Sequence, residues 1–322
     1  MWYHCGMGTT PPRQSARRGL EAGGGADPRL LIRAVRLARS VEQGRHGTGE
    51  RGDSTEFFDH RPYETGDPLS TVDWRLYGRT DRHYVRRFRH DARLTVTVAL
   101  DASASMDFTG LPGARSGVSV LERGVELGAA TLALGARQGD RVGALVVGED
   151  RGGVRRVPAA PGRGGLVRAV GMLGVTRPGG IGALAGTDPS SAGPLARAIG
   201  QVLDGGDAPA RRGVIVLIGD GYEPLGALGR ALAMARACGA SVVVLRVLAP
   251  GGVAGATVER TTYVDPETGV RVRGGEAASR GLRAHTLGLE RVARRVGVRV
   301  VDAPTDADPA VALRDAFARR LR

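Results

Sequence analysis

The chain has 322 residues, enough for two domains or for one large domain with an appendage. Hydrophobic residues make up 42% and charged residues 25%, which are ordinary globular values and exclude a fibrous or wholly disordered chain. The net charge of +13 favours an anionic partner such as nucleic acid. However, the chain contains no lysine and no asparagine, and this skew toward arginine is typical of a GC-rich genome. Composition therefore explains part of the charge without a binding partner.

The first third of the chain changes character twice. Residues 1–26 are rich in Gly, Pro and Arg without periodicity, which predicts a flexible tail. Apolar residues at helical spacing predict an amphipathic helix at Leu30–Val41. Residues 46–91 are dense in charge and aromatic side chains, unlike a low-complexity linker, so we expect an ordered arm there. We group this helix and the arm as residues 27–93.

From residue 94 to the end, apolar strands alternate with helices. Strands are predicted at Leu94–Asp101, Arg141–Val147, Val214–Ile218, Ser241–Val247 and Val298–Asp302. Helices are predicted at Leu121–Arg137, Leu166–Leu173, Leu195–Leu203, Leu225–Cys238, Leu282–Val296 and Pro309–Leu321, and a hairpin at Thr262–Arg273. Continuous apolar strands between amphipathic helices indicate an α/β fold, with a doubly wound, mainly parallel sheet over residues 94–322.

The expected location is the cytoplasm. Two cysteines, Cys5 and Cys238, are too few for a disulfide framework or a cysteine-rich zinc site. No apolar stretch approaches the length of a membrane span, and the first residues lack the apolar core of a signal peptide. We therefore expect a soluble protein with reduced thiols.

The clearest chemical feature is an acid and two hydroxyls at alternating positions after the first apolar strand: Asp101, Ser103 and Ser105. Hard oxygen donors of this kind suit Mg²⁺ or Mn²⁺ rather than zinc. Two later motifs fall at the same edge of a parallel sheet, Gly-Thr-Asp at 186–188 and Gly-Asp-Gly at 219–221. Each motif also has a plain structural explanation, as a helix cap or a turn. Their coincidence at one edge favours a metal site.

This series of motifs resembles the von Willebrand factor A domain with its metal-ion-dependent adhesion site (MIDAS). The resemblance covers residues 94–322. It implies a divalent cation, Mg²⁺ or Mn²⁺, held by Asp101, Ser103, Ser105, Thr187 and Asp220. The hydroxyls would approach the cation, and the carboxylates would supply negative charge directly or through water. Such domains often carry Thr before the final Asp-Gly, where this chain has Gly219.

The aromatic arm resembles the domain of unknown function 58 family, in which a similar block precedes a von Willebrand factor A-like domain. The pattern is Arg-x-Tyr-x-x-Gly-Asp, then Asp-Trp and Arg, within residues 56–79. We expect charge-assisted bonds and aromatic packing to pin the arm to the core; the alternative is a docking surface for a partner. The residues concerned are Arg61, Tyr63, Asp67, Asp73, Trp74 and Arg79.

The resemblance implies a metal-ion-dependent protein–protein interaction module that is not an enzyme. The family is associated with MoxR-type AAA+ ATPases, so the implied role is an adaptor or co-chaperone in complex assembly or maturation. Two alternatives stay open: a basic nucleic-acid-associated protein, and a Mg²⁺-dependent hydrolase. No residue of the sequence is recognisable as the base that a hydrolase would need. The histidines do not have the spacing of a zinc site, and the chain contains no Gly-x-Ser-x-Gly motif of the kind that carries a serine nucleophile.

Overall fold

The computed structural model describes residues 3–4, 27–43, 57–67, 69, 72–88, 94–110, 117–149, 153–179, 192–205, 213–250, 262–264, 271–273 and 275–318. The chain divides into two compact units. The smaller unit comprises residues 45–93, and the larger comprises residues 1–44 together with 94–322.

The larger unit is built on a central sheet that, within the described residues, has six strands in the order β11-β8-β7-β4-β5-β6. Neighbouring strands run parallel, except that β6 is antiparallel to β5. The strands are β4 (Thr95–Asp101), β5 (Arg141–Glu149), β6 (Gly153–Ala160), β7 (Val214–Gly219), β8 (Ser241–Leu248) and β11 (Arg299–Pro304). The predicted α/β fold with a mainly parallel sheet is confirmed.

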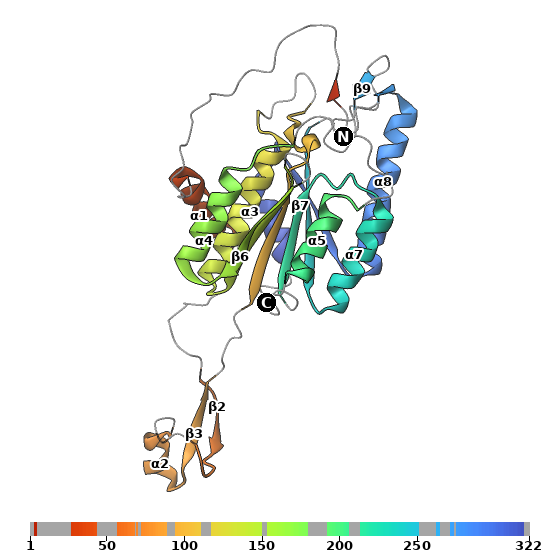
Figure 1. Ribbon diagram of the computed structural model, residues 1–322. Helices are drawn as coiled ribbons and strands as arrows, with labels where there is room; N and C mark the ends of the chain where they lie inside the picture. Colours follow the sequence, from red (N-terminus) through yellow and green to blue (C-terminus); the bar gives the residue numbers. More distant parts are fainter. Residues whose placement is uncertain are drawn as a thin grey trace. The chain divides into compact units, whose positions relative to one another are not determined.

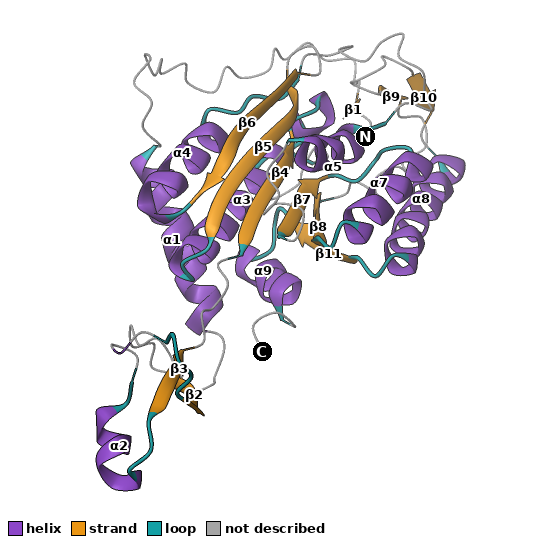
Figure 2. Cartoon of the chain, turned by 60° about the horizontal axis from the view of Figure 1, so that its bottom comes forward, coloured by secondary structure: helices purple, strands orange, loops and turns teal. Residues whose placement is uncertain are grey.

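Helices cover both faces of this sheet, as Figures 1 and 2 show. One face carries α1 (Pro28–Gln43), α3 (Val120–Arg137), α4 (Gly162–Gly174) and α9 (Pro309–Phe317). The other face carries α5 (Pro194–Asp204), α7 (Leu225–Ala237) and α8 (Glu276–Arg295). Because α3 and α7 follow the neighbouring strands β4 and β7 on opposite faces, the chain reverses its winding between these two strands.

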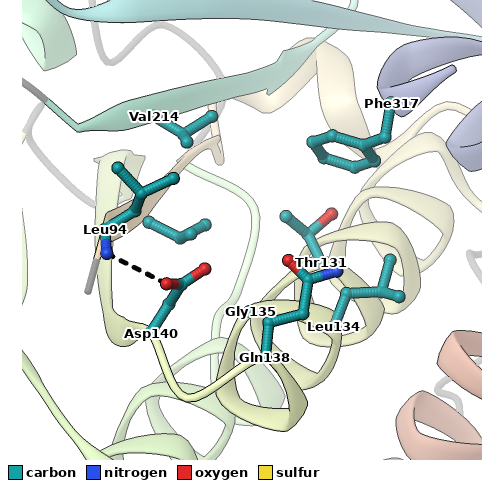
Figure 3. A pocket seen from close by; sticks show the side chains of 9 residues that line it. Leu94, Thr131, Leu134, Gly135, Gln138, Asp140, Val214 and Phe317 are labelled. Atoms are coloured by element: carbon teal, nitrogen blue, oxygen red, sulfur yellow. Dashed lines mark hydrogen bonds between the residues drawn. The ribbon is translucent and has the colours of Figure 1, made fainter. Parts of the chain in front are cut away.

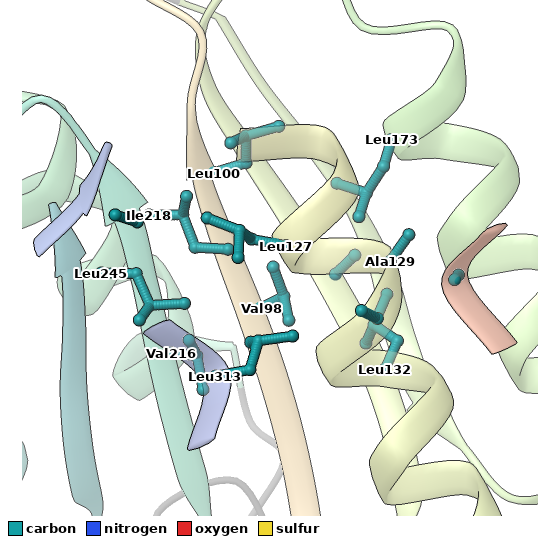
Figure 4. Close-up of a cluster of buried hydrophobic side chains, with 14 of the residues drawn as sticks. Val98, Leu100, Leu127, Ala129, Leu132, Leu173, Val216, Ile218, Leu245 and Leu313 are labelled. Carbon is teal, nitrogen blue, oxygen red and sulfur yellow. The ribbon is translucent and has the colours of Figure 1, made fainter. Parts of the chain in front are cut away.

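The two helix layers explain why the central strands are apolar throughout. In β7, Val214, Val216 and Ile218 belong to the hydrophobic cluster beneath α1, α3, α4 and α9, part of which Figure 4 shows. Ile215 and Leu217 belong to the cluster beneath α5, α7 and α8. Successive side chains of a strand point to opposite faces, so a strand buried on both faces needs no polar alternation.

The first helix belongs to the larger unit. Ala34, Ala38 and Val41 on α1 are buried in the same cluster as α3 and the sheet, and Arg33 pairs with Glu126 of α3 at 2.7 Å. The predicted grouping of residues 27–93 is therefore wrong at its amino end. The amphipathic pattern of α1 indicated a buried stripe but not which surface covers it.

Edge elements are the least visible in the sequence. Strand β6 was not predicted, because it is only half-buried at the sheet edge and contains Arg155, Arg156 and Pro158. The predicted hairpin forms from β9 (Thr262–Val264) and β10 (Arg271–Arg273), outside the main sheet. Strand β1 (Tyr3–His4) pairs with β9, so these two residues depart from the tail predicted for residues 1–26.

In its described residues, the smaller unit contains a hairpin and one short helix. Strands β2 (Phe57–Pro62) and β3 (Tyr84–Phe88) pair antiparallel, and α2 (Trp74–Thr80) lies between them in sequence. The side chain of Asp73 accepts hydrogen bonds from the backbone N–H groups of Arg75 and Leu76, which caps the start of α2. Asp81, with φ of 52°, ends the helix in the left-handed region.

A pocket of about 90 Å³ lies at the amino ends of the central strands (Figure 3). Leu94, Val214 and Phe317 contribute much of its apolar lining. The carboxylate of Asp140 accepts the backbone N–H of Leu94 at 3.0 Å, which ties the entry to β4 to the entry to β5. The pocket is thus at the opposite end of the sheet from the Asp101 loop.

The position of α1 gives a stability test. Ala38 is 0% exposed, so Ala38→Glu places a carboxylate in the core and should lower the free energy of unfolding of the larger unit, on the order of 3 kcal/mol. Arg36→Glu, at an exposed position of the same helix, should change it little. Urea unfolding followed by circular dichroism measures both; equal effects would place α1 away from the sheet.

Candidate metal centre

The loop after β4 brings Asp101, Ser103 and Ser105 together. All three side chains are buried. The carboxylate oxygen Oδ1 of Asp101 accepts the backbone N–H of Ser103 at 2.8 Å, and the two serine Oγ atoms lie 3.1 Å apart. The backbone N–H of Ala102 donates to the carbonyl of Val147, which fixes the loop against β5. The spacing of acid and hydroxyls thus produces one compact cluster of oxygen atoms.

Asp220 approaches the same cluster from the neighbouring strand. Leu100 of β4 pairs with Ile218 of β7, so the ends of these two strands lie side by side. Asp101 and Asp220 are each only 3% exposed. The Oδ1 atom of Asp220 accepts the backbone N–H of Tyr222 at 3.0 Å, whereas its Oδ2 atom is buried and has no hydrogen-bond partner among the described residues.

Two glycines permit this approach. A Cβ atom at position 219 would lie 2.9 Å from Cβ of Asp101 and 3.2 Å from its Oδ2, so a side chain there would displace that carboxylate. Gly221 has φ of 75°, which glycine adopts without the strain that other residues incur. The chain can therefore turn sharply after Asp220, and the departure at Gly219 leaves room for Asp101.

The cluster carries negative charge, and no basic side chain of the described residues forms an ion pair with Asp101, Asp220 or Glu223. Burial raises the pKa of Asp101 well above its usual range, and the charge of Asp220 raises it further. The hydrogen bonds from Ser103 oppose this shift, and Glu223 adds to it. Two buried carboxylates at neighbouring strand ends are destabilising unless a proton or a cation compensates them.

Glu223 is a site residue that sequence reasoning missed. Its Oε2 atom accepts the backbone N–H of Ala196, in the first turn of α5, at 3.3 Å. Its Oε1 atom is buried, and no described residue forms a hydrogen bond with it. Burial raises the pKa of Glu223 to about 7 and the charge of Asp220 raises it further, whereas the hydrogen bond from Ala196 and the charge of Arg197 lower it. The available signal was a second acid in the same loop, three residues after Asp220.

Thr187 lies outside the described residues, but the flanks of its segment reach the cluster. The backbone N–H of Gly179 donates to the carbonyl of Ala102 at 2.7 Å. At the other end, a Cβ atom at Gly193 would lie 2.2 Å from Oε2 of Glu223. The described residues Gly179 and Gly193, on either side of Thr187 in sequence, therefore both lie beside the predicted site.

The donor set fits a hard divalent cation. Every side-chain donor is oxygen, and the net charge of the donors is negative. Two buried carboxylate oxygens, one of Asp220 and one of Glu223, have no hydrogen-bond partner in the part of the chain that the structure describes. Within the described part of the chain, no group of three His, Cys, Asp or Glu side chains is close enough to hold a metal by itself. The serine hydroxyls would thus have to complete the coordination, which favours Mg²⁺ or Mn²⁺ over zinc.

The predicted arm residues make charge-assisted bonds within the smaller unit. Arg61 Nη2 lies 2.5 Å from Asp67 Oδ1, and Asp67 also accepts the backbone N–H of Glu64. The hydrogen bond from Arg61 lowers the pKa of Asp67. Asp73 both caps α2 and contacts His60 Nε2 at 3.0 Å. These bonds organise the arm itself.

The aromatic residues of the arm are less buried than expected. Trp74 is 55% exposed and meets Tyr77 and His83 edge-on. The ring of Tyr63 lies 6.3 Å from that of His83, which stacks on Tyr77 at 4.4 Å. Arg79 is exposed in the last turn of α2. Trp74 is therefore not a buried anchor.

Comparison with protein families identifies the chain. The family described as "Protein of unknown function DUF58" matches residues 59–295, which spans the arm and most of the sheet unit. The chain belongs to the DUF58 family. Curated relatives of this DUF58 protein include Uncharacterized protein Rv1480 of Mycobacterium tuberculosis and Uncharacterized protein Mb1516 of Mycobacterium bovis. Each is 28% identical over 301 residues, covering 88% of this chain and 87% of the relative.

Solved structures similar to this DUF58 protein include BatB from Bacteroides thetaiotaomicron, with a TM-score of 0.44 and 19% identity over 71% of this chain and 98% of that one. The von Willebrand factor A (VWA) domain of SpRpn10 gives a TM-score of 0.38 and 10% identity, over 69% and 94% of the two chains. The larger unit has the doubly wound arrangement expected of a VWA-like domain. In the part of the chain that the structure describes, no helix has the length and apolar character needed to cross a bilayer.

Asp220→Asn tests the cation site. Asn keeps an oxygen for the N–H of Tyr222 but removes one buried negative charge. In EDTA the variant should be at least as stable as wild type, because repulsion with Asp101 is relieved. Mg²⁺ at about 100 times its dissociation constant should stabilise wild type by about 2.7 kcal/mol and the variant much less.

Thermal unfolding with and without Mg²⁺ measures this difference. Asp306→Asn changes the net charge equally at an exposed position and should keep the full response to Mg²⁺. Equal Mg²⁺ stabilisation of wild type and Asp220→Asn would contradict a cation at Asp220.

Glu223→Gln asks whether the missed acid acts on the cation or only caps α5. Gln retains an oxygen acceptor for the N–H of Ala196, so the fold should persist. Loss of the charge should weaken Mg²⁺ binding about tenfold, since a carboxylate near the ion no longer attracts it. Isothermal titration measures the affinity, with Glu64→Gln in the smaller unit as the control. An unchanged affinity would leave Glu223 as a cap alone.

Proposed function

We propose that this DUF58 protein is a protein–protein interaction module whose binding depends on a divalent cation. One observation carries the proposal: buried, uncompensated oxygen donors gather at the carboxyl ends of β4 and β7, where the winding of the sheet reverses. In open α/β sheets this is the place where ligands bind. The VWA-like fold supports an interaction role.

The proposed ligands of Mg²⁺ or Mn²⁺ are Asp101, Ser103, Ser105, Thr187 and Asp220. Bound there, the cation would supply an electrophilic position for a carboxylate of the partner. The bond from Ser103 N–H to Asp101 Oδ1 orients the first carboxylate, and the bond from Tyr222 N–H to Asp220 Oδ1 orients the second. Each acid thus keeps its other oxygen for the ion, and Glu223 adds negative charge nearby.

We propose binding without turnover. Hydrolysis by Ser103 or Ser105 would need a base on the serine hydroxyl. His285 is beside the Asp220 loop, but its Nε2 atom bonds to the carbonyl oxygen of Gly221 at 3.0 Å. The two serine hydroxyls instead bond to each other. This arrangement favours a binding site over a hydrolase.

The proposed partner is a MoxR-type AAA+ ATPase, for which this protein would act as an adaptor or co-chaperone. This part of the proposal rests on the family resemblance of the arm and the VWA-like domain. The exposed Trp74 of the arm is available as a contact residue, because tryptophan is common among residues that dominate interface energetics.

Capture of the partner tests the proposed function. The purified MoxR-type ATPase of the same organism should bind the immobilised protein in Mg²⁺ and dissociate in EDTA. Ser103→Ala and Asp220→Asn should reduce capture about tenfold or more, because the cation and its open position are lost. Asp306→Asn should bind as wild type does. Binding that survives EDTA and both variants would refute the cation mechanism, and turnover of phosphoester or ester substrates lost in Asp101→Ala would favour a hydrolase.

A further inference from the structure

The peptide group that joins Gly221 to Tyr222 is hydrogen-bonded at both ends. Its N–H, on Tyr222, donates to Oδ1 of Asp220 at 3.0 Å. Its carbonyl oxygen, on Gly221, lies 3.0 Å from Nε2 of His285 on α8. Because a carbonyl oxygen can only accept, Nε2 carries the proton and donates it. The N–H and C=O of a planar trans peptide point in opposite directions, so the two hydrogen bonds are in series.

Gly221 does not fix this peptide by itself. Its φ of 75° lies in the left-handed region, one of many conformations that glycine adopts at little cost. The peptide could therefore rotate and turn its N–H away from Asp220. The charges of Asp101 and Asp220 repel each other, and such a rotation would let the second carboxylate move away from the first. An interaction from outside the loop is needed to hold the peptide.

Helix α8 supplies that interaction from a position fixed by the core. Leu289 is 0% exposed and belongs to the hydrophobic cluster beneath α5, α7 and α8. It follows His285 by four residues, so both side chains lie on the same face of the helix. A Cβ atom at Gly221 would lie 3.0 Å from Cδ2 of Leu289, and the ring of His285 lies 5.6 Å from the ring of Tyr222. One face of α8 thus contacts the loop at both residues of the peptide.

We propose that His285 is a positioning residue for the cation site. It holds the Gly221–Tyr222 peptide, and through that peptide it orients the carboxylate of Asp220 so that Oδ2 stays directed at the ion. Hydrogen bonds in series strengthen one another, so loss of the His285 bond also weakens the bond to Asp220. This inference rests on the proposed function and adds to its site a residue that does not contact the ion.

Two variants separate the hydrogen bond from the ring contact. His285→Phe keeps a ring beside Tyr222 but has no donor for the carbonyl of Gly221. His285→Gln has no ring, but its amide nitrogen is as many bonds from Cα as Nε2 of histidine and can donate to that carbonyl. If His285 acts through its hydrogen bond, glutamine restores the function that phenylalanine removes.

Hydrogen exchange of the Tyr222 amide tests the two hydrogen bonds without any cation. In EDTA, His285→Phe should make this amide exchange with solvent about tenfold faster, because the bond to Asp220 opens more often. His285→Gln should stay within about threefold of wild type. Nuclear magnetic resonance measures the exchange. Wild-type exchange in His285→Phe, or equal acceleration in both variants, would overturn the inference.

The affinity for Mg²⁺ tests the consequence for the site. His285→Phe should weaken Mg²⁺ binding about tenfold, and His285→Gln should bind within about threefold of wild type. His285→Asn, whose amide is one bond too short to reach the carbonyl, should resemble His285→Phe without its bulky ring. His83→Phe, the same change at an exposed position of the smaller unit, is the control and should bind as wild type does. Isothermal titration measures all four.

The two measurements distinguish failure of this inference from failure of the proposed function. Binding of Mg²⁺ by wild type with full affinity in His285→Phe would retain the cation site and refute the positioning role. No Mg²⁺ binding by wild type would refute the cation site, whereas the expected exchange pattern would still support the orientation of Asp220 by His285.

Discussion

The repulsion between two buried carboxylates is the constraint on which this structure depends. Asp101 and Asp220 end neighbouring parallel strands, each almost fully removed from water, and no basic side chain within the described residues forms an ion pair with either. Such an arrangement is unfavourable for the chain alone, because an isolated buried charge costs several kcal/mol even after its surroundings relax. A proton on Asp101 or the cation proposed for this site would compensate the charge. The proposed cation would thereby link binding to the stability of the fold.

The rest of the larger unit holds Asp101 and Asp220 in fixed positions. The central strands are buried on both faces by helices, so the ends of β4 and β7 cannot separate without exposing the core. Gly219 allows Asp101 to lie against β7, and Gly221 allows the chain to turn immediately after Asp220. Backbone N–H groups hold one oxygen of each carboxylate. The acids are thus positioned by the fold before any ligand arrives, which lowers the entropic cost of binding.

The sequence predicted this architecture well where burial dictates the residue type. The strands Val214–Ile218 and Ser241–Val247 are apolar because helices cover both faces, and no other common element has that pattern at that length. Strand β6 lacks the pattern because an edge strand is solvated on one side and needs residues such as Pro158 to prevent further pairing. Helix α1 was recognised, but its periodicity encodes only that a stripe is buried. The partner surface on α3 is far away in sequence, so the helix was grouped with the arm.

The residues of the candidate site could likewise be predicted only where local spacing or strand topology places them. Asp101, Ser103 and Ser105 are close in sequence, so their cluster follows from local spacing, and the parallel topology brings Asp220 to the same edge. Glu223 could not be ranked in this way, because its importance comes from burial and from the first turn of α5, which no local pattern reports. The exposure of Trp74 could not be predicted either, because an aromatic motif does not specify which residues cover it.

Helix α8 connects the core to the loop after Asp220. Its inner face packs Leu289 and Ala293 into the core, and His285 on the same helix bonds to the carbonyl of Gly221. Leu289 also lies against Gly221. The backbone next to Asp220 is therefore held by the core, so a cation bound at the proposed site would meet carboxylates whose supporting loop is already fixed.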